Sequence, residues 1–401
     1  MRPADDLRAQ GDRDLAEKLL KNIDVRRARE KLEKEADKLG ARRQLLATAL
    51  RLSEGMAPDV DQVMKSCQET LGMDSPLETY VYPDASFNAA AVHPERGRMF
   101  VLVSSALLEE FEPGELRFVV GHELGHHLFD HHGIPVAAML RGKQRIDPGT
   151  LLRMFAWKRH AEISSDRAGL VCAGDLDSAI HALFKVASGL HGDRIKVQVD
   201  PVLKQLDDLR EEARRMASAD EPVRADWFST HPFSPLRLRA AQLFAASERM
   251  VDGGTPMSEV EEQVQDLMDL MDPSYLADRS DEAEAMRRLL FAGGVLLAAA
   301  DGEVSQETLD ELEDLLGAGS VPSEINPPAI LEVLDRRIKA VREQVPPLRR
   351  AQVIRDLCIV AQADGVVTEA ETALLLQIAD GVGVDRGTIY CVLPDAEERG
   401  K

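Results

Sequence analysis

The sequence contains no apolar run long enough to cross a membrane. Its best candidate, FAGGVLLAAA at 291–300, has about half of the length that a bilayer-spanning helix needs, and Asp301 follows it directly. The first twenty residues carry charges throughout and lack the apolar core of a signal peptide. We therefore expect a soluble, cytoplasmic protein without a membrane span.

Cysteine is scarce as well. The four cysteines, Cys67, Cys172, Cys358 and Cys391, lie far apart and form no CxxC pair. This spacing argues against a disulfide framework and against a zinc site built from cysteines. Reduced and mostly buried thiols are the expected state.

Basic residues are outnumbered by acidic ones, and the net charge is −21. From residue 251 onward 31 acidic residues stand against 13 basic ones, whereas the first 52 residues are slightly basic. Nucleic-acid-binding surfaces are normally basic, so we expect no nucleic acid among the partners. The acidic C-terminal part instead favours a protein partner or a divalent cation.

Changes in composition divide the chain into four parts. Residues 1–55 form a charged helical segment, 56–250 carry the chemically distinctive motifs, 251–280 form an acidic linker with a short helix, and 281–395 form a helical domain. Helix-forming residues dominate the first part, which predicts one or two helices. These helices either pack on their own domain or bind a partner helix.

The second part combines strands and helices. TYVYP at 79–83 and MFVLVS at 99–104 are rich in β-forming residues and predict a small sheet. Helical periodicity returns at Pro113 and again from about Leu151 to Cys172. The expected fold class is α+β, predominantly α-helical.

The last part contains an internal repeat, in which residues 295–317 align with 358–381. Each copy consists of an apolar helix, an Asp-Gly turn, a Ser or Thr N-cap and a second helix. Thr368 and Glu371 have the spacing of a capping box. Two such units are expected to pack together as an all-α bundle.

Residues 117–132, RFVVGHELGHHLFDHH, hold five of the ten histidines. Within them, His122 to His126 form the pattern HExxH. Positions i and i+4 of a helix lie on one face, so both imidazoles can reach one cation. Glu123 can then contact a metal-bound water as a general base. A solvated helix with surface histidines is the alternative.

Two residues compete for the place of the third ligand. His132 follows His126 at the spacing of metzincins, but Phe129 stands where that pattern needs a glycine. Glu162, in the segment RHAEISSDRAG, is followed one helical turn later by Asp166. One carboxylate would complete the metal site, and the other would accept a hydrogen bond from a ligand histidine.

At this point the sequence resembles the gluzincin metallopeptidases of the CAAX-prenyl-protease, HtpX and Oma group. The resemblance rests on HExxH at 122–126, ExxxD at 162–166 and a His-Pro at His231 that precedes Arg237, in that order. It covers about residues 60–250. It implies a zincin-type peptidase domain with a small β-sheet.

The resemblance also implies a set of functional residues. One Zn²⁺ per chain is bound by His122, His126 and Glu162, and Glu123 is the general base. The remaining implied roles are a partner for a ligand histidine (Asp166), a donor to the oxyanion (His231), an orienting residue (Arg237) and the start of the substrate-binding strands (Asn88 and Ala89).

The C-terminal repeat resembles a second family, the TerB-like domains of tellurite resistance, over about residues 280–395. These domains are helical bundles with acidic turns. The acidic turn residues Asp301, Glu303 and Asp364 do not follow the EF-hand pattern, because Gln306 and Leu312 stand where that loop needs Gly and Glu. N-capping and turn formation are therefore their favoured roles.

The sequence thus predicts a soluble zinc metalloendopeptidase that cleaves a protein or peptide substrate, with a TerB-like domain that regulates it or recruits substrates. A non-enzymatic, zinc-stabilised scaffold in a stress-response complex is the alternative. We expect an extended substrate to pair with the strand at Met99–Ser104. His127, His131 and His132 are expected to be bystanders.

Overall fold

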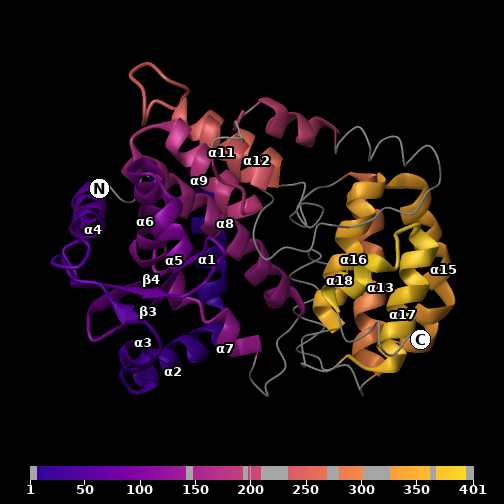
Figure 1. Ribbon diagram of the computed structural model, residues 1–401. Coiled ribbons are helices and arrows are strands. Elements are labelled where there is room, and N and C mark those ends of the chain that lie inside the picture. The colour runs from indigo at the N-terminus through magenta and orange to yellow at the C-terminus, as the bar shows by residue number, and fades with distance from the viewer. Residues whose placement is uncertain are drawn as a thin grey trace. The chain divides into compact units, whose positions relative to one another are not determined.

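The computed structural model describes residues 7–140, 148–192, 197–198, 200–208, 234–268, 280–300, 326–361 and 367–393. The chain divides into two compact units, and Figure 1 shows their helices and strands. The first unit comprises Met1–Pro135, Trp157–Gln205 and His231–Leu267. The second comprises Val136–Ala156, Leu206–Thr230 and Met268–Lys401. The described part is mainly helical with one four-stranded sheet, so the predicted α+β class is confirmed.

The N-terminal segment of the first unit forms three helices, where one or two were expected. These are α1 (Gln10–Lys21), α2 (Ile23–Leu39) and α3 (Ala41–Thr48). Helix α1 buries Asp12, Ala16 and Leu19, so it packs on its own unit. The other helices of the first unit are α4 (Pro58–Leu71), α5 (Ser105–Glu110), α6 (Pro113–Leu128), α9 (Leu176–Ser188), α11 (Ser234–Ala245) and α12 (Met257–Met268).

The sheet has the strand order β1-β2-β4-β3. Its members are β1 (Leu50–Arg51), β2 (Leu77–Tyr82), β3 (Ala89–Glu95) and β4 (Arg98–Ser104). Strands β2 and β4 are parallel neighbours and contain the two predicted β-rich segments. Strands β3 and β4 form an antiparallel hairpin through Arg96 and Gly97, whose φ angles of 52° and 71° suit a two-residue turn between twisted strands.

The pairing of β4 corrects the expectation that a substrate pairs with Met99–Ser104. Strand β4 is hydrogen-bonded to β2 on one side and to β3 on the other, so its backbone groups are already used. Among the strands that the structure describes, β3 lies at the edge of the sheet next to helix α6. Strand β3 therefore has a neighbouring strand on one side only, whereas β4 has one on each side.

Helix α6 begins at Pro113, as its sequence predicts. Proline suits a first turn because its missing N–H has no intrahelical partner there. Glu112 and Glu115 form a capping box, which satisfies two backbone N–H groups at the helix start. The helix ends at Leu128, and Asp130 then adopts the left-handed conformation with φ 54°. The short 3-10 turn η1 (His131–Gly133) follows.

Helix α8 (Pro148–Ala173) carries the ExxxD pattern and packs closely against α6. Glycines permit this approach. A Cβ added at Gly121 would lie 2.7 Å from the Cys172 side chain, and one at Gly125 would lie 3.0 Å from the Ser165 Cα. On the facing helix, a Cβ at Gly169 would lie 2.6 Å from the Phe118 carbonyl oxygen. The glycine inside HExxH thus allows α8 to bring its carboxylates beside the two histidines.

The second unit is a helical bundle around an apolar core. Its described helices are α7 (Val136–Leu140), α13 (Asp281–Ala300), α15 (Pro327–Gln344), α16 (Pro347–Ala361), α17 (Glu369–Val382) and α18 (Gly387–Val392). The predicted capping box of Thr368 and Glu371 is confirmed at the start of α17. The acidic turn residues and the second helix of the first repeat copy lie outside the described residues.

Residues 251–280 were predicted from composition to form an acidic linker with a short helix. However, α12 buries Val260 and Val264 and belongs to the first unit. The predicted domain boundaries otherwise stay predictions. None of the helices that the structure describes has both the length and the apolar character that a membrane crossing requires.

Candidate metal centre

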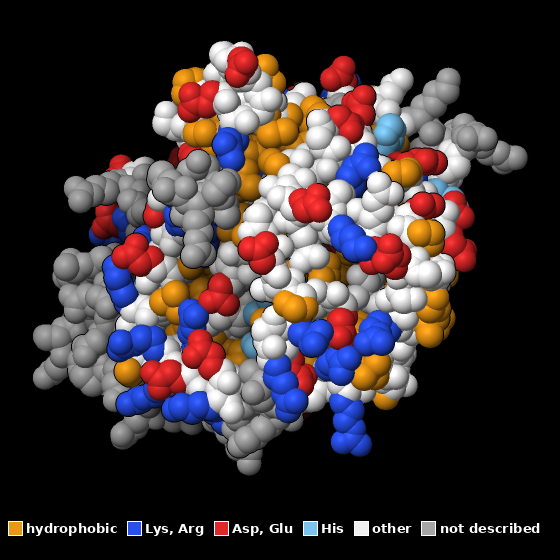
Figure 2. All heavy atoms as spheres, turned by 90° about the vertical axis from the view of Figure 1, so that its left-hand side faces the viewer, with side chains coloured by type: hydrophobic (Ala, Val, Ile, Leu, Met, Phe, Trp, Pro, Cys, Tyr) orange, Lys and Arg blue, Asp and Glu red, His pale blue; other side chains and the backbone are white. Residues whose placement is uncertain are grey.

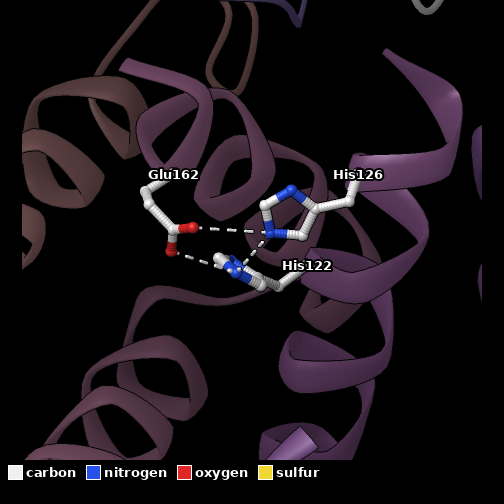
Figure 3. Close-up of side chains that lie close together, drawn as sticks. All are labelled: His122, His126 and Glu162. Carbon is white, nitrogen blue, oxygen red and sulfur yellow. Dashed lines mark hydrogen bonds and ion pairs between the residues drawn. The ribbon is translucent and has the colours of Figure 1, made fainter. Parts of the chain in front are cut away.

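Three side chains converge between helices α6 and α8. His122 and His126 project from α6, and Glu162 projects from α8 towards both of them (Figure 3). The two Nε2 atoms are 3.3 Å apart, and they lie 3.5 Å and 3.6 Å from the carboxylate oxygens of Glu162. His122 and Glu162 are buried, whereas His126 is partly exposed.

These separations fit a zinc ion. Zinc bonds to histidine nitrogen and carboxylate oxygen are about 2.0–2.1 Å long, so two ligand atoms at neighbouring corners of a tetrahedron lie about 3.3 Å apart. The observed distances of 3.3–3.6 Å agree with this spacing. The three residues also match the combination of two histidines and one glutamate that many catalytic zinc sites use.

The hydrogen bonds on the outer side of each ring support the same conclusion. The Nδ1 of His122 lies 2.9 Å from Asp166, and the Nδ1 of His126 lies 2.9 Å from the Nδ1 of His131. If each Nδ1 carries the ring proton and donates it outwards, both Nε2 atoms are bare acceptors. In that protonation state two acceptors and a carboxylate face one another, an arrangement that a bound cation stabilises.

The electrostatic surroundings differ among the three candidate ligands. Burial by itself lowers the pKa of His122, but hydrogen bonds to Asp166 and Glu162 outweigh it and raise that pKa to about 10. Burial lowers the pKa of His126 well below its usual value, so this ring is neutral. Burial opposes ionisation of Glu162, yet the neighbouring His122 keeps the pKa of this carboxylate well below its usual range.

Glu123 is held beside the metal site by the edge strand. Its Oε2 accepts a hydrogen bond from the backbone N–H of Ala91 in β3. Burial raises the pKa of Glu123, and the negative charge of Glu162 contributes to this increase. A carboxylate with a raised pKa takes up a proton more readily, which suits a general base.

Asp166 and Arg237 both lie at the Nδ1 atom of His122, on the side of the ring that faces away from Glu162. Arg237, on α11, donates to both carboxylate oxygens of Asp166 at 2.8 Å and 2.6 Å, and its Nη1 lies 3.7 Å from Glu162. Burial disfavours the charged form of Asp166, but Arg237 outweighs it and lowers the pKa of this carboxylate. The arginine therefore forms an ion pair with the carboxylate that contacts Nδ1 of the candidate ligand His122.

The other predicted site residues are placed as follows. Asn88 lies immediately before β3, where its N–H donates to the Ser104 hydroxyl, and Ala89 opens the strand. His231 falls outside the described residues. On the face shown in Figure 2, basic and acidic side chains are interspersed, and histidine side chains are visible near the middle and at the upper right.

The competing ligand, His132, does not join the cluster that the described residues form. Its ring centroid lies 5.7 Å from that of His93 and 5.0 Å from that of His127, and burial lowers its pKa to about 3. His127 also points elsewhere, because its Nε2 lies 3.1 Å from the Phe100 carbonyl oxygen.

His131, which was expected to be a bystander, has polar contacts at both of its ring nitrogens. Its Nδ1 contacts His126, and its Nε2 lies 3.0 Å from a carboxylate oxygen of Asp12 in helix α1. The left-handed conformation of Asp130 turns the chain back after α6 and presents His131 to the metal site. Sequence patterns did not reveal Asp12, which is 119 residues away.

Comparison with known proteins gives two families. Residues 55–146 and 146–244 match peptidase family M48, and residues 332–390 match tellurite resistance protein TerB. No solved structure gives a significant match.

Two curated proteins are similar to this chain. One is the plastoglobule-localized metallopeptidase 48 of Arabidopsis thaliana, a chloroplastic protein, at 25% identity over 40% of this chain and 49% of its own length. The other is a protease HtpX homolog of Bacillus subtilis (strain 168), at 26% identity over 45% of this chain and 67% of its own length. The chain thus spans about half of the first relative and two thirds of the second. It carries a peptidase family M48 domain followed by a TerB domain.

Proposed function

We propose that this chain is a zinc-dependent metalloendopeptidase that holds one zinc ion with His122, His126 and Glu162. The observation that carries the proposal is the approach of the two Nε2 atoms and the Glu162 carboxylate to 3.3–3.6 Å of one another. The similarity to two proteins named as a metallopeptidase and a protease supports the same reaction class.

The residues around this site then have separate roles. When bound, zinc supplies Lewis acidity and makes water a stronger nucleophile at neutral pH. Glu123 accepts the proton of the attacking water and returns it to the leaving amine. Asp166 holds the His122 ring through Nδ1, and Arg237 holds Asp166 in turn. His231 is proposed as the donor that stabilises the oxyanion.

The substrate is proposed to be an extended stretch of protein or peptide that pairs with the outer edge of β3. The N–H of Ala91 already points towards Glu123, so a chain along this edge passes beside the general base. Asn88 and Ala89 stand at the beginning of this edge. Backbone pairing supplies affinity with little dependence on the substrate sequence.

The TerB domain is proposed to regulate the peptidase or to recruit its substrates. The chain from residue 251 onward has a large excess of acidic residues, which suits a basic protein partner or a divalent cation. Calorimetric titration with Ca²⁺ tests the cation, and a flat thermogram contradicts it. The cytoplasmic location stays a prediction that cell fractionation tests.

A cleavage assay of the whole chain tests the proposed function. A fluorogenic peptide library is incubated with the wild type, with the chelator-treated protein and with the chelated protein after zinc is added back. We expect cleavage to stop on chelation and to return with zinc. Glu123→Gln should retain zinc but lose activity by about 100-fold or more, because the base is lost while the ligands remain.

Glu109→Gln is the matched control, because Glu109 is exposed on α5 and should leave the rate unchanged. Undiminished cleavage by the zinc-loaded Glu123→Gln variant contradicts the assignment of the base. A wild-type chain that binds zinc but cleaves no peptide in the library supports the scaffold alternative instead.

A further inference from the structure

The outer side of His126 is connected to the N-terminal helix through a second histidine. The Nδ1 of His126 lies 2.9 Å from the Nδ1 of His131, and the Nε2 of His131 lies 3.0 Å from Oδ2 of Asp12. The three residues come from α6, η1 and α1 respectively. We call them the His126–His131–Asp12 chain.

The donors and acceptors in this chain can be assigned from its geometry. A metal at the Nε2 of His126 leaves the ring proton on Nδ1, and this N–H must be donated to His131. The Nδ1 of His131 then acts as an acceptor, so His131 carries its own proton on Nε2. That N–H is donated to the carboxylate of Asp12, which has only acceptors when ionised.

Asp12 is held in place by several other donors. Trp157 Nε1 donates to its Oδ1 at 2.9 Å, and the Ser164 hydroxyl donates to its Oδ2 at 2.7 Å. Arg8 donates to both oxygens at 2.9 Å. The side chain is fully buried, with 0% exposure. A buried carboxylate is costly unless donors and positive charges surround it, and here they do.

Helix α1 is fixed closely enough to hold this carboxylate in position. The N–H of Ala9 donates to the Ser164 hydroxyl at 3.0 Å, which anchors the start of α1 on α8. Gly11 faces the His160 ring so closely that an added Cβ would overlap it. Both contacts set the distance between α1 and the helix that carries Glu162.

We propose that His131 and Asp12 are positioning residues that fix the ring proton and the ring plane of His126 for metal binding. Helix α1 lies outside residues 55–244, which match the peptidase family, so a segment that precedes the family domain completes the metal centre. His122 is supported by Asp166 directly, and His126 is supported by Asp12 through one more imidazole. This inference rests on the proposed zinc site.

Zinc affinity measured on the full-length chain tests the proposal. The zinc dissociation constant is determined by competition with a chromophoric chelator for the wild type, Asp12→Asn and His131→Phe. Removal of such an outer hydrogen bond typically weakens metal binding by about 10–100-fold, and we expect this range for both variants. His131→Gln should recover part of the loss, because its amide can both accept and donate.

Asp14→Asn is the matched control, because it makes the same change on the same helix at an exposed position, and its dissociation constant should equal that of the wild type. The visible spectrum of the Co²⁺-substituted protein provides a second readout. We expect the bands to shift in Asp12→Asn and to stay unchanged in Asp14→Asn. Unchanged zinc affinity in a folded Asp12→Asn variant overturns the proposal.

A measurement on the wild type avoids any dependence on how the variants fold. Nitrogen NMR of ¹⁵N-histidine-labelled, zinc-bound protein identifies which ring nitrogen of His131 carries the proton. We expect the proton on Nε2, and a proton on Nδ1 overturns the proposal. A wild-type chain that binds no zinc overturns the proposed function as well, whereas the outcomes above overturn only the inference.

Discussion

Helices α6 and α8 bury one kind of side chain, and helices α13, α15, α16 and α17 of the second unit bury another. Between α6 and α8 lie buried histidines and carboxylates that contact one another, together with Arg237. The helices of the second unit instead share an apolar core of leucine, isoleucine, valine and alanine.

Several buried polar groups of the second unit contact the ends of helices, whereas Arg355 and Asp356 form a buried ion pair within α16. Arg350 donates to the carbonyl oxygens of Val345 and Val382, and Glu371 accepts from the N–H of Thr368. Such contacts satisfy backbone groups that helix ends leave unpaired. In the first unit the side chains of His122, His126 and Glu162 instead converge, with their ligand atoms 3.3–3.6 Å apart. Groups of buried side chains with shifted pKa values are enriched at functional sites, which favours a functional role for the group in the first unit.

The largest expected effect concerns the third ligand. Glu162→Ala should weaken zinc binding by more than about 100-fold, because it removes a ligand, whereas loss of a hydrogen bond to a ligand typically costs 10–100-fold. His132→Ala should leave zinc binding unchanged. Metal analysis after dialysis measures both. Retained zinc in Glu162→Ala together with lost zinc in His132→Ala would restore the metzincin arrangement.

Replacement of a large core side chain of the second unit by alanine should have the next largest effect. Leu357 is fully buried, so Leu357→Ala should lower stability by about 2–5 kcal/mol. Leu331→Ala, at an exposed position of α15, should change it by less than about 0.5 kcal/mol. Hydrogen exchange of the α13 and α16 amides measures the difference. Equal protection in both variants would show that this core does not stabilise the bundle.

A smaller loss is expected where α6 and α8 meet. Gly169→Ala forces a methyl group against the Phe118 carbonyl oxygen and should lower the free energy of unfolding by about 1–3 kcal/mol. Gly55→Ala is the control, because Gly55 lies in an exposed turn with no described atom near its added Cβ. Chemical denaturation compares them, and an equally stable Gly169→Ala variant would refute the close packing of the two helices.

The smallest effect concerns acid stability. Burial tends to raise the pKa of Asp12, but hydrogen bonds from His131 and Arg8 outweigh it and hold this pKa well below its usual value of 3.8. The ionised carboxylate therefore stabilises the fold fully above that value, and the contribution shrinks as the pH falls below it.

The zinc-free wild type and Asp12→Asn should thus differ most in stability near neutral pH and become more alike in acid. Denaturation curves at several pH values measure this difference. A gap that stays constant down to the lowest pH would contradict the ionised state of Asp12 at neutral pH.

Local patterns predicted much of the site. The HExxH spacing places two imidazoles on one face of a helix, and the spacing of Glu162 and Asp166 places two carboxylates on one face of another. Both patterns depend only on the 3.6-residue period, which the folded helices keep. The start of α6 at Pro113 was predictable for the same local reason.

Longer-range features were not predictable in this way. His131 lies beyond the end of α6, so helical periodicity says nothing about its direction, which the left-handed Asp130 sets. Asp12 has the spacing of an ordinary surface ion pair with Arg8, and only the packing of α1 makes it a buried acceptor. The edge position of β3 likewise depends on strand order, which short sequence windows do not contain.

X-ray absorption spectroscopy at the zinc edge of the loaded wild-type protein tests the metal centre most directly. We predict two imidazole nitrogens at about 2.0–2.1 Å, together with oxygen ligands at about 2.0–2.2 Å from Glu162 and a water. A shell of three imidazoles, or a sulfur at about 2.3 Å, would contradict the assignment of His122, His126 and Glu162 as the ligands.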